Sequence, residues 1–112
     1  MAGQITVVMA QVNLMVGDID GNTDIVLQNA KQAMGDYGAH IIVFPELTLT
    51  GYPPEDLLLR PSLEVRIDKA LQRIKAANLD IVMVLGFPDR EGEQLFNAAT
   101  VIKGSNCLGK YR

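Results

Sequence analysis

Short apolar runs rich in β-branched residues alternate with amphipathic segments along this 112-residue chain. Three such runs cover residues 5–12, 40–44 and 80–87, and each has the length and composition of a strand buried on both faces. The segments 22–37 and 63–76 separate the runs and place their apolar residues at helical spacing. This alternation is typical of an α/β fold in which helices pack on one sheet.

Polar and turn-forming residues predict where the two helices begin and end. Asn22 is expected to cap the first helix, because its side chain can accept from a free backbone N–H, and Gly35 and Gly38 to mark its frayed end. Ser62, after Pro61, is expected to cap the second. The predicted core faces are Val26, Ala30, Ala33, Met34 and Tyr37 in the first helix and Leu63, Ile67, Ala70, Leu71 and Ile74 in the second.

The last third of the chain predicts a hairpin. Gly86 and Pro88 are expected to close the third strand, and a polar turn follows. Two further strands at 95–102 and 107–112 are joined by the tight segment 103–106. The predicted order is β–α–β–loop–α–β–β–β. With no helix after the final strand to cover the hairpin, the pattern predicts a truncated domain.

The segment IIVFPELTLTGYPPEDLL (41–58) carries the main candidate site. Its apolar run stops at Pro45, and the next residue is Glu46. In open α/β sheets ligands bind beyond the carboxyl ends of the strands, where partial desolvation raises the pKa of a carboxylate toward that of a useful base. Glu46 is therefore a candidate general base. Spacing alone leaves a helix cap or a surface carboxylate as alternatives.

Tyr52 and the pair Pro53-Pro54 follow Glu46 at a distance that lets the loop fold back over a cleft. Proline restricts itself and the residue before it, so such a loop needs little ordering when a ligand arrives. A rigid connector that touches no ligand remains the alternative for these residues.

Two lone residues are expected to be structural. Cys107 is the only cysteine, lies in a predicted strand after a turn, and is interpreted as a small buried hydrophobe. His40 is the only histidine and lacks the paired Cys or His of a metal site. The sequence GDIDGN (17–22) matches neither a phosphate loop nor a dinucleotide fingerprint. No metal or cofactor site is therefore predicted.

Charge and hydropathy exclude several classes of partner. The net charge of −3, without a block of like charges, argues against nucleic acid and against an anionic membrane surface. No apolar run approaches the ~18 residues needed to span a bilayer, and the N-terminus lacks the features of a signal peptide. A cytoplasmic location is the expectation.

The motif FPELTLTGY (44–52) resembles the glutamate motif of the nitrilase, or carbon–nitrogen hydrolase, superfamily. AQVNLMVGDIDGN (10–22), LGFP (85–88), LFNAATVI (95–102) and GKYR (109–112) resemble further segments of that family in the same order. The resemblance covers nearly the whole chain. GYPPEDLLLRP (51–61) is more specific and resembles the glutamine-hydrolysing domain of glutamine-dependent NAD⁺ synthetases.

This resemblance implies an αββα sandwich with a Glu–Lys–Cys triad, in which cysteine attacks an amide carbonyl, ammonia leaves and water releases the acyl group. Glu46 matches the family's glutamate, a general base, and Tyr52 matches a position beside the substrate pocket. The family's lysine would directly follow Arg112, so Lys110 is not its counterpart. The cysteine would lie further on, so Cys107 is not its counterpart either, and the chain alone is expected to be inactive.

The resemblance also implies that residues 1–112 are a truncated glutamine amidotransferase domain of a homo-oligomeric enzyme that uses glutamine. A synthetase domain, absent from these residues, would bind ATP with Mg²⁺ and convert deamido-NAD⁺ to NAD⁺. Two alternatives stay open. One is a stand-alone amidase of the superfamily acting on an ω-amide or carbamoyl substrate, and the other is a non-catalytic module that binds a partner through its uncovered sheet.

Overall fold

The computed structural model describes residues 3–15, 18–45, 48–50, 61–91 and 94–111. Its elements are β1 (Val7–Met9), α1 (Ile19–Tyr37), β2 (Ile41–Val43), α3 (Pro61–Ala77), β3 (Leu79–Glu91), β4 (Gln94–Gly104) and β5 (Asn106–Tyr111). This order confirms the α/β alternation predicted from the sequence. No helix within the described residues is long and apolar enough to cross a membrane.

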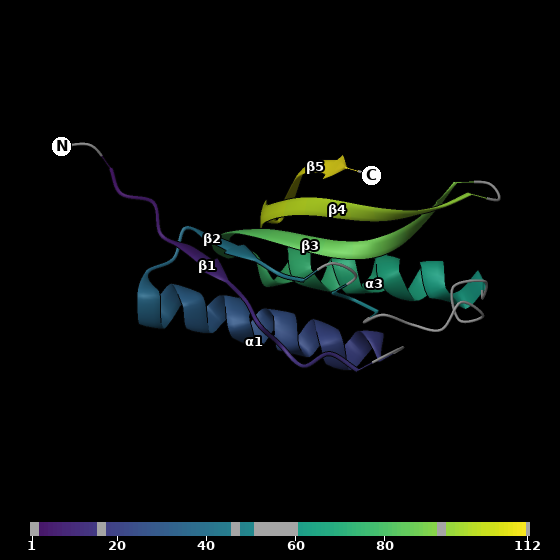
Figure 1. Cartoon of the computed structure of the whole chain (residues 1–112), viewed down its shortest axis with the longest axis horizontal. Coiled ribbons are helices and arrows are strands. Elements are labelled where there is room, and N and C mark those ends of the chain that lie inside the picture. Colours follow the sequence, from purple (N-terminus) through teal and green to yellow (C-terminus); the bar gives the residue numbers. More distant parts are fainter. Residues whose placement is uncertain (1–2, 16–17, 46–47, 51–60, 92–93, 112) are drawn as a thin grey trace.

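The strands form one sheet in the order β1-β2-β3-β4-β5. β1, β2 and β3 run parallel to one another, whereas β4 and β5 are antiparallel to their neighbours. Both helices lie against the same face of this sheet, with α1 and α3 side by side (Figure 1). The sheet therefore has one helix-covered face, and no described helix covers the other.

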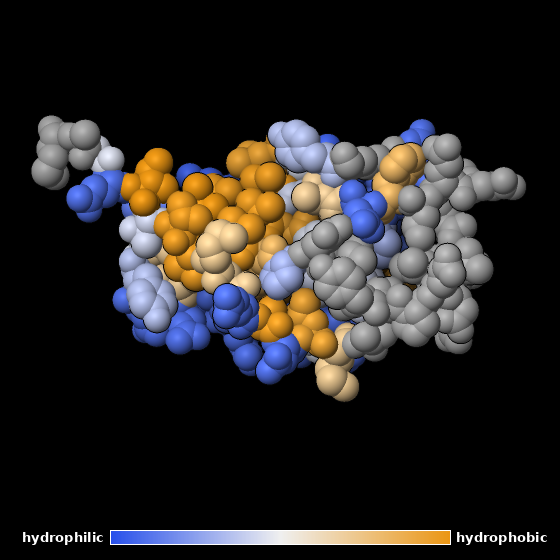
Figure 2. Space-filling model, viewed as in Figure 1, coloured by the Kyte–Doolittle hydropathy of each residue, from blue (hydrophilic) through white to orange (hydrophobic). Residues whose placement is uncertain are grey.

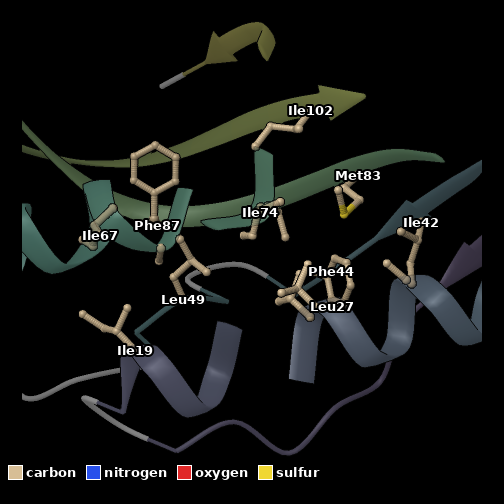
Figure 3. Packing of buried hydrophobic residues seen from close by; sticks show 14 of the residues in the cluster. Ile19, Leu27, Ile42, Phe44, Leu49, Ile67, Ile74, Met83, Phe87 and Ile102 are labelled. Carbon is tan, nitrogen blue, oxygen red and sulfur yellow. The ribbon is translucent and has the colours of Figure 1, made fainter. Parts of the chain in front are cut away.

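The core lies between the helices and the helix-covered face (Figure 3). Alternate residues of β3 point into it and meet their register partners on β4, so Met83 lies opposite Ile102 and Phe87 opposite Ala98. The helix-covered face of these two strands is formed by Ile81, Met83, Leu85, Phe87, Ala98, Thr100 and Ile102, all buried. Burial of this surface is the main source of stability.

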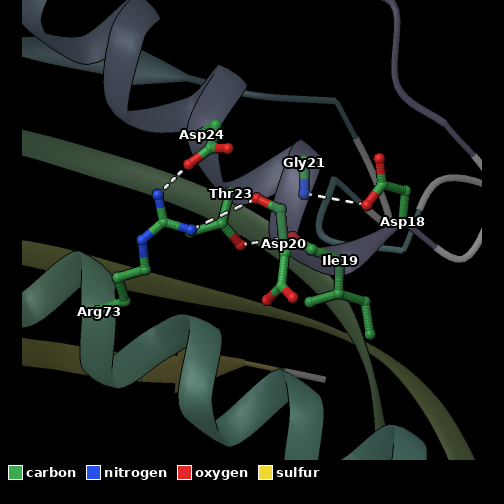
Figure 4. Close-up of polar contacts among 7 residues, drawn as sticks. All are labelled: Asp18, Ile19, Asp20, Gly21, Thr23, Asp24 and Arg73. Atoms are coloured by element: carbon green, nitrogen blue, oxygen red, sulfur yellow. Dashed lines mark hydrogen bonds and ion pairs between the residues drawn. The ribbon is translucent and has the colours of Figure 1, made fainter.

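The start of α1 differs from the prediction. Asp18 is the N-cap, and its Oδ1 accepts a hydrogen bond from the Gly21 N–H at 3.1 Å (Figure 4). Asn22 lies in the first helical turn and is fully buried, so its predicted role as a cap was wrong. Gly38 ends the helix in the left-handed conformation with φ 57°, as expected for a C-cap.

The predicted core faces of the helices are largely confirmed. In α1, Val26, Ala30 and Ala33 are buried and Met34 partly so, but Tyr37 is exposed near the helix end. All predicted core positions of α3 are buried or, at Leu71, partly buried: Leu63, Ile67, Ala70, Leu71 and Ile74. The helix α3 already includes Ser62, so that residue is not its cap. Pro61 suits the first helical position because proline has no N–H to leave unpaired.

Two expectations for the strands were wrong. β1 is not buried on both faces, since Val7 and Met9 are exposed on the side without helices. β3 does not end at Gly86 and Pro88 but continues to Glu91. Pro88 is tolerated because it lies beyond the stretch where β2 pairs with β3, so its missing N–H costs no ladder bond on that side.

The C-terminal hairpin is confirmed. Lys103 pairs with Asn106 across the turn, and Gly104 adopts φ 62°. A Cβ at Gly104 would lie 2.9 Å from Oδ1 of Asn78, which itself ends α3 with a positive φ. Glycine is therefore favoured at this turn by its backbone angle, and an added Cβ would also force the Asn78 side chain to shift.

Candidate active site

A cavity of about 350 Å³ lies where the chain leaves the carboxyl end of β2. Its wall is formed by Phe44, Pro45, Val84, Leu85, Gly86, Asn97, Ala98, Ala99 and Tyr111. Gly86, Ala99 and Tyr111 are register partners across β3, β4 and β5. They alternate with residues that face the helices, so the cavity opens on the uncovered face of the sheet.

Small side chains account for the hollow. Gly86 and Ala99 lie side by side and leave space above the sheet, while the ring of Tyr111 forms a wall. That ring lies over Gly109, where an added Cβ would be 2.8 Å from the tyrosine hydroxyl. Larger residues at these positions would fill the cavity or move its wall.

The two residues singled out as catalytic and substrate-binding, Glu46 and Tyr52, lie outside the described residues, as do Pro53 and Pro54. The residues on either side of Glu46 are described. Pro45 lines the cavity directly before it.

The described segment after Glu46, residues 48–50, is held by hydrogen bonds. Thr48 Oγ1 donates to the carbonyl of Pro45, and the N–H of Leu49 donates to the carbonyl of Gly86 at 3.3 Å. The side chain of Leu49 is fully buried in the core (Figure 3). Before Glu46, the N–H of Phe44 donates to the carbonyl of Val84 at 3.0 Å, so the chain is tied to the sheet on both sides of Glu46.

Asn22 also holds the segment 48–50 in place, and it is not the helix cap that the sequence predicts. Its Oδ1 accepts from the N–H of Met15 at 2.9 Å, and its Nδ2 donates to the carbonyl of Met15 at 2.8 Å. The same Nδ2 donates to the carbonyl of Leu49 at 3.1 Å. An asparagine in the first turn of an amphipathic helix reads equally well as a cap, so the spacing gave no signal for this role.

Lys110 is directed away from the cavity. It pairs in register with Thr100, whose side chain is buried on the helix-covered face. Its Nζ lies 3.1 Å from Oδ2 of Asp89, and Lys110 is not among the residues that line the cavity. The ion pair with Asp89 therefore holds the Lys110 ammonium group on the helix-covered side, away from the cavity.

The structural roles predicted for His40 and Cys107 have different outcomes. His40 is structural, as expected, since its Nδ1 accepts from the N–H of Thr6 at 3.0 Å. Cys107 is exposed, so its interpretation as a buried hydrophobe was wrong; it lies on the edge strand β5, beside Thr100 Oγ1 at 3.2 Å. Across the parts of the chain that the structure describes, no group of three His, Cys, Asp or Glu residues could hold a metal ion.

A layered α/β sheet with a cavity beyond the carboxyl end of a parallel strand is the arrangement in which enzymes of this class bind ligands. The chain matches the carbon–nitrogen hydrolase family over residues 6–112 and belongs to it. The resemblance stated from the motifs is thereby confirmed.

Individual relatives narrow the comparison from the family to one kind of enzyme within it. The chain is 40% identical over 111 residues to a glutamine-dependent NAD(+) synthetase from Xanthomonas campestris, covering 99% of this chain and 20% of that protein. A solved glutamine-dependent NAD⁺ synthetase from Acinetobacter baumannii, in complex with ADP, matches 94% of the chain with a TM-score of 0.86 and 42% identity; the match covers 20% of that structure. The chain thus spans about a fifth of the length of these relatives.

An amidase from Nesterenkonia sp. shares the fold with a TM-score of 0.81 and 25% identity. The match covers 96% of this chain and 42% of the amidase. The architecture is therefore common to synthetases and to amidases of the nitrilase type, and it confirms the fold class predicted from the sequence.

Proposed function

We propose that these residues form the first part of the glutamine-hydrolysing domain of a glutamine-dependent NAD⁺ synthetase. The observation that carries this proposal is the 40% identity that extends over 99% of the chain to a protein of that name. The cavity beside Pro45 supports it, because it lies where the proposed base, Glu46, enters the sequence.

In the proposed reaction, Glu46 takes the proton of a cysteine thiol as the sulfur attacks the side-chain amide carbon of glutamine. The C–N bond breaks, and the leaving nitrogen receives the proton and departs as ammonia. Glu46 then takes a proton from water as the water oxygen attacks the thioester carbon. The C–S bond breaks, glutamate leaves, and the proton on Glu46 returns to the cysteine thiolate. Tyr52 is proposed to line the substrate pocket.

The lysine and cysteine of this triad are proposed to lie beyond residue 112. The pairing of Lys110 with Asp89 and its absence from the cavity wall support assigning the lysine elsewhere. A lysine two positions after Tyr111, on a strand that continued in the same direction, would share the uncovered face with Tyr111 because side chains alternate along a strand. The 112-residue chain alone is therefore proposed to be inactive.

The remaining chemistry is assigned to a synthetase domain outside these residues, which would bind ATP with Mg²⁺ and deamido-NAD⁺ and receive the ammonia. A cytoplasmic homo-oligomer is part of the same proposal.

Ammonia release from glutamine tests the proposal. The full-length protein that contains this chain should release ammonia, whereas the isolated 112-residue chain should not. Glu46→Gln should lower the rate by about 10²- to 10⁴-fold, since this is the usual contribution of a general base. Glu64→Gln, an exposed carboxylate on α3, is the matched control and should leave the rate unchanged. Glutamine hydrolysis by the isolated chain, abolished by Glu46→Gln, would contradict the assignment of the other two groups.

A second candidate is a stand-alone amidase, because the Nesterenkonia amidase shares the fold over 96% of this chain with a TM-score of 0.81. Such a protein would release ammonia from simple aliphatic amides and would form no NAD⁺ from deamido-NAD⁺ and ATP. Measuring both activities on the same preparation separates the two candidates.

A further inference from the structure

The side-chain amide of Asn22 makes an unusually complete set of hydrogen bonds for a residue inside a helix. It is fully buried, and both of its N–H donors are used, one by the carbonyl of Met15 and the other by that of Leu49. Its oxygen accepts from the N–H of Met15. A buried amide costs stability unless it is paired, so this side chain fits only while both partner segments stay in place.

These bonds join segments that are distant in the sequence. Met15 belongs to the loop before α1, and Leu49 lies 27 residues after Asn22. Because the N–H of Leu49 also donates to the carbonyl of Gly86, the peptide groups of Leu49 connect α1 to β3. Gly86 in turn lines the cavity.

Leu49 is close in sequence to the proposed base. Glu46 lies between Pro45, which lines the cavity, and Thr48, whose hydroxyl donates to the Pro45 carbonyl. Asn22 on α1 reaches the described segment 48–50 through the hydrogen bond from its Nδ2 to the Leu49 carbonyl, at 3.1 Å. Loss of its amide would free one of the two backbone anchors of Leu49 and leave the Leu49 carbonyl buried without that partner.

We propose that Asn22 is a positioning residue for Glu46: through its bond to the Leu49 carbonyl it fixes the segment that follows the general base. This inference rests on the proposed function of Glu46. Asn22 does not line the cavity, so it is not expected to touch glutamine. A general base displaced by about 1 Å loses on the order of 10²-fold in rate, whereas binding of the substrate is little affected.

The test uses Asn22→Asp in the full-length protein. This variant keeps the size and the acceptor oxygen but loses both donors. We expect kcat for glutamine hydrolysis to fall by about 10- to 100-fold, with KM changed by less than about 3-fold. The matched control is Thr23→Val, which removes the buried bond from Thr23 Oγ1 to the Ile19 carbonyl (2.7 Å) without touching Leu49, and it should leave kcat unchanged.

A double-mutant cycle with Glu46→Gln distinguishes positioning from a general loss of structure. If Asn22 acts through Glu46, Asn22→Asp should cause no further loss of kcat in the Glu46→Gln background. An unchanged kcat in Asn22→Asp, or an equal loss in both backgrounds, would overturn the inference. Failure of Asn22→Asp to fold while Thr23→Val folds would also overturn it, because the amide would then serve the fold and not the base.

Failure of the proposed function is recognised separately. If the wild-type protein releases no ammonia from glutamine, the same comparison is made with butyramide as the amide, and the cycle still reports on Asn22. If Glu46→Gln is fully active on either amide, both the proposed base and its positioning residue are wrong. If Glu46→Gln is inactive and Asn22→Asp is as active as the wild type, only the positioning role is wrong.

Discussion

The two faces of the sheet differ although the same strands build them. On the helix-covered face Met83 is 0% exposed, whereas on the uncovered face Met9 is 69% and Val7 49% exposed. Hydrophobic residues gather visibly over β1 and the neighbouring strands on the uncovered face (Figure 2). The covered face carries the burial that stabilises the fold, and the uncovered face carries the cavity that Pro45 lines.

Replacing a methionine by alanine on each face of the sheet should give the largest difference in stability. Met83→Ala should lower the free energy of unfolding by about 2–5 kcal/mol, because it opens a cavity in a packed core. Met9→Ala should lower it by less than about 0.5 kcal/mol, since an exposed side chain has little burial to lose. Urea unfolding of both variants measures the difference. Equal losses would mean that the uncovered face is buried in solution.

Two glycines in different backbone conformations should respond oppositely to alanine, one in the turn between β4 and β5 and the other in α1. Gly104→Ala should destabilise the hairpin by about 1–2 kcal/mol, because a side chain at φ 62° is strained and would meet Asn78. Gly35→Ala, in the exposed part of α1 with nothing near its Cβ, should stabilise the chain by about 0.5–1 kcal/mol. Thermal unfolding of both variants checks the sign. Stabilisation by Gly104→Ala would show that the turn has another conformation.

The smallest effect concerns the helix layer. The guanidinium of Arg73 on α3 forms an ion pair with Asp24 on α1 and donates to the carbonyl of Asp20 at 3.4 Å (Figure 4). Both charged side chains are about half exposed, at 44% and 55%, so their coupling should be about 0.5 kcal/mol and should weaken with salt. A double-mutant cycle at low and high salt measures it, and a coupling above about 2 kcal/mol would indicate a drier contact between the helices.

Periodicity predicted which elements form and in what order, because burial on one face repeats at fixed spacing in helices and strands. It did not predict which strand residues are exposed. Val7 and Met9 are as apolar as the buried residues of β3, and only the position of the helices decides which face is covered. The length of β3 was also missed, since Pro88 ends a strand only where a neighbour needs its N–H.

The candidate site was predicted unevenly, for similar reasons. The position of Pro45 at the cavity agrees with a site beyond the end of β2, whereas the roles of Glu46 and Tyr52 remain predictions. Asn22 was mistaken for a helix cap because its partners, Met15 and Leu49, come together only in the folded chain. Local spacing contains no information about a partner 27 residues away.

The proposed function assigns the cavity on the uncovered face to glutamine hydrolysis, with Glu46 as the general base. The most direct measurement is NAD⁺ formation from deamido-NAD⁺ and ATP by full-length Glu46→Gln, supplied with either glutamine or ammonium. We expect the glutamine-supplied rate to fall by about 10²- to 10⁴-fold, while the ammonium-supplied rate should equal that of the wild type. Equal rates with glutamine in the variant and the wild type would contradict it.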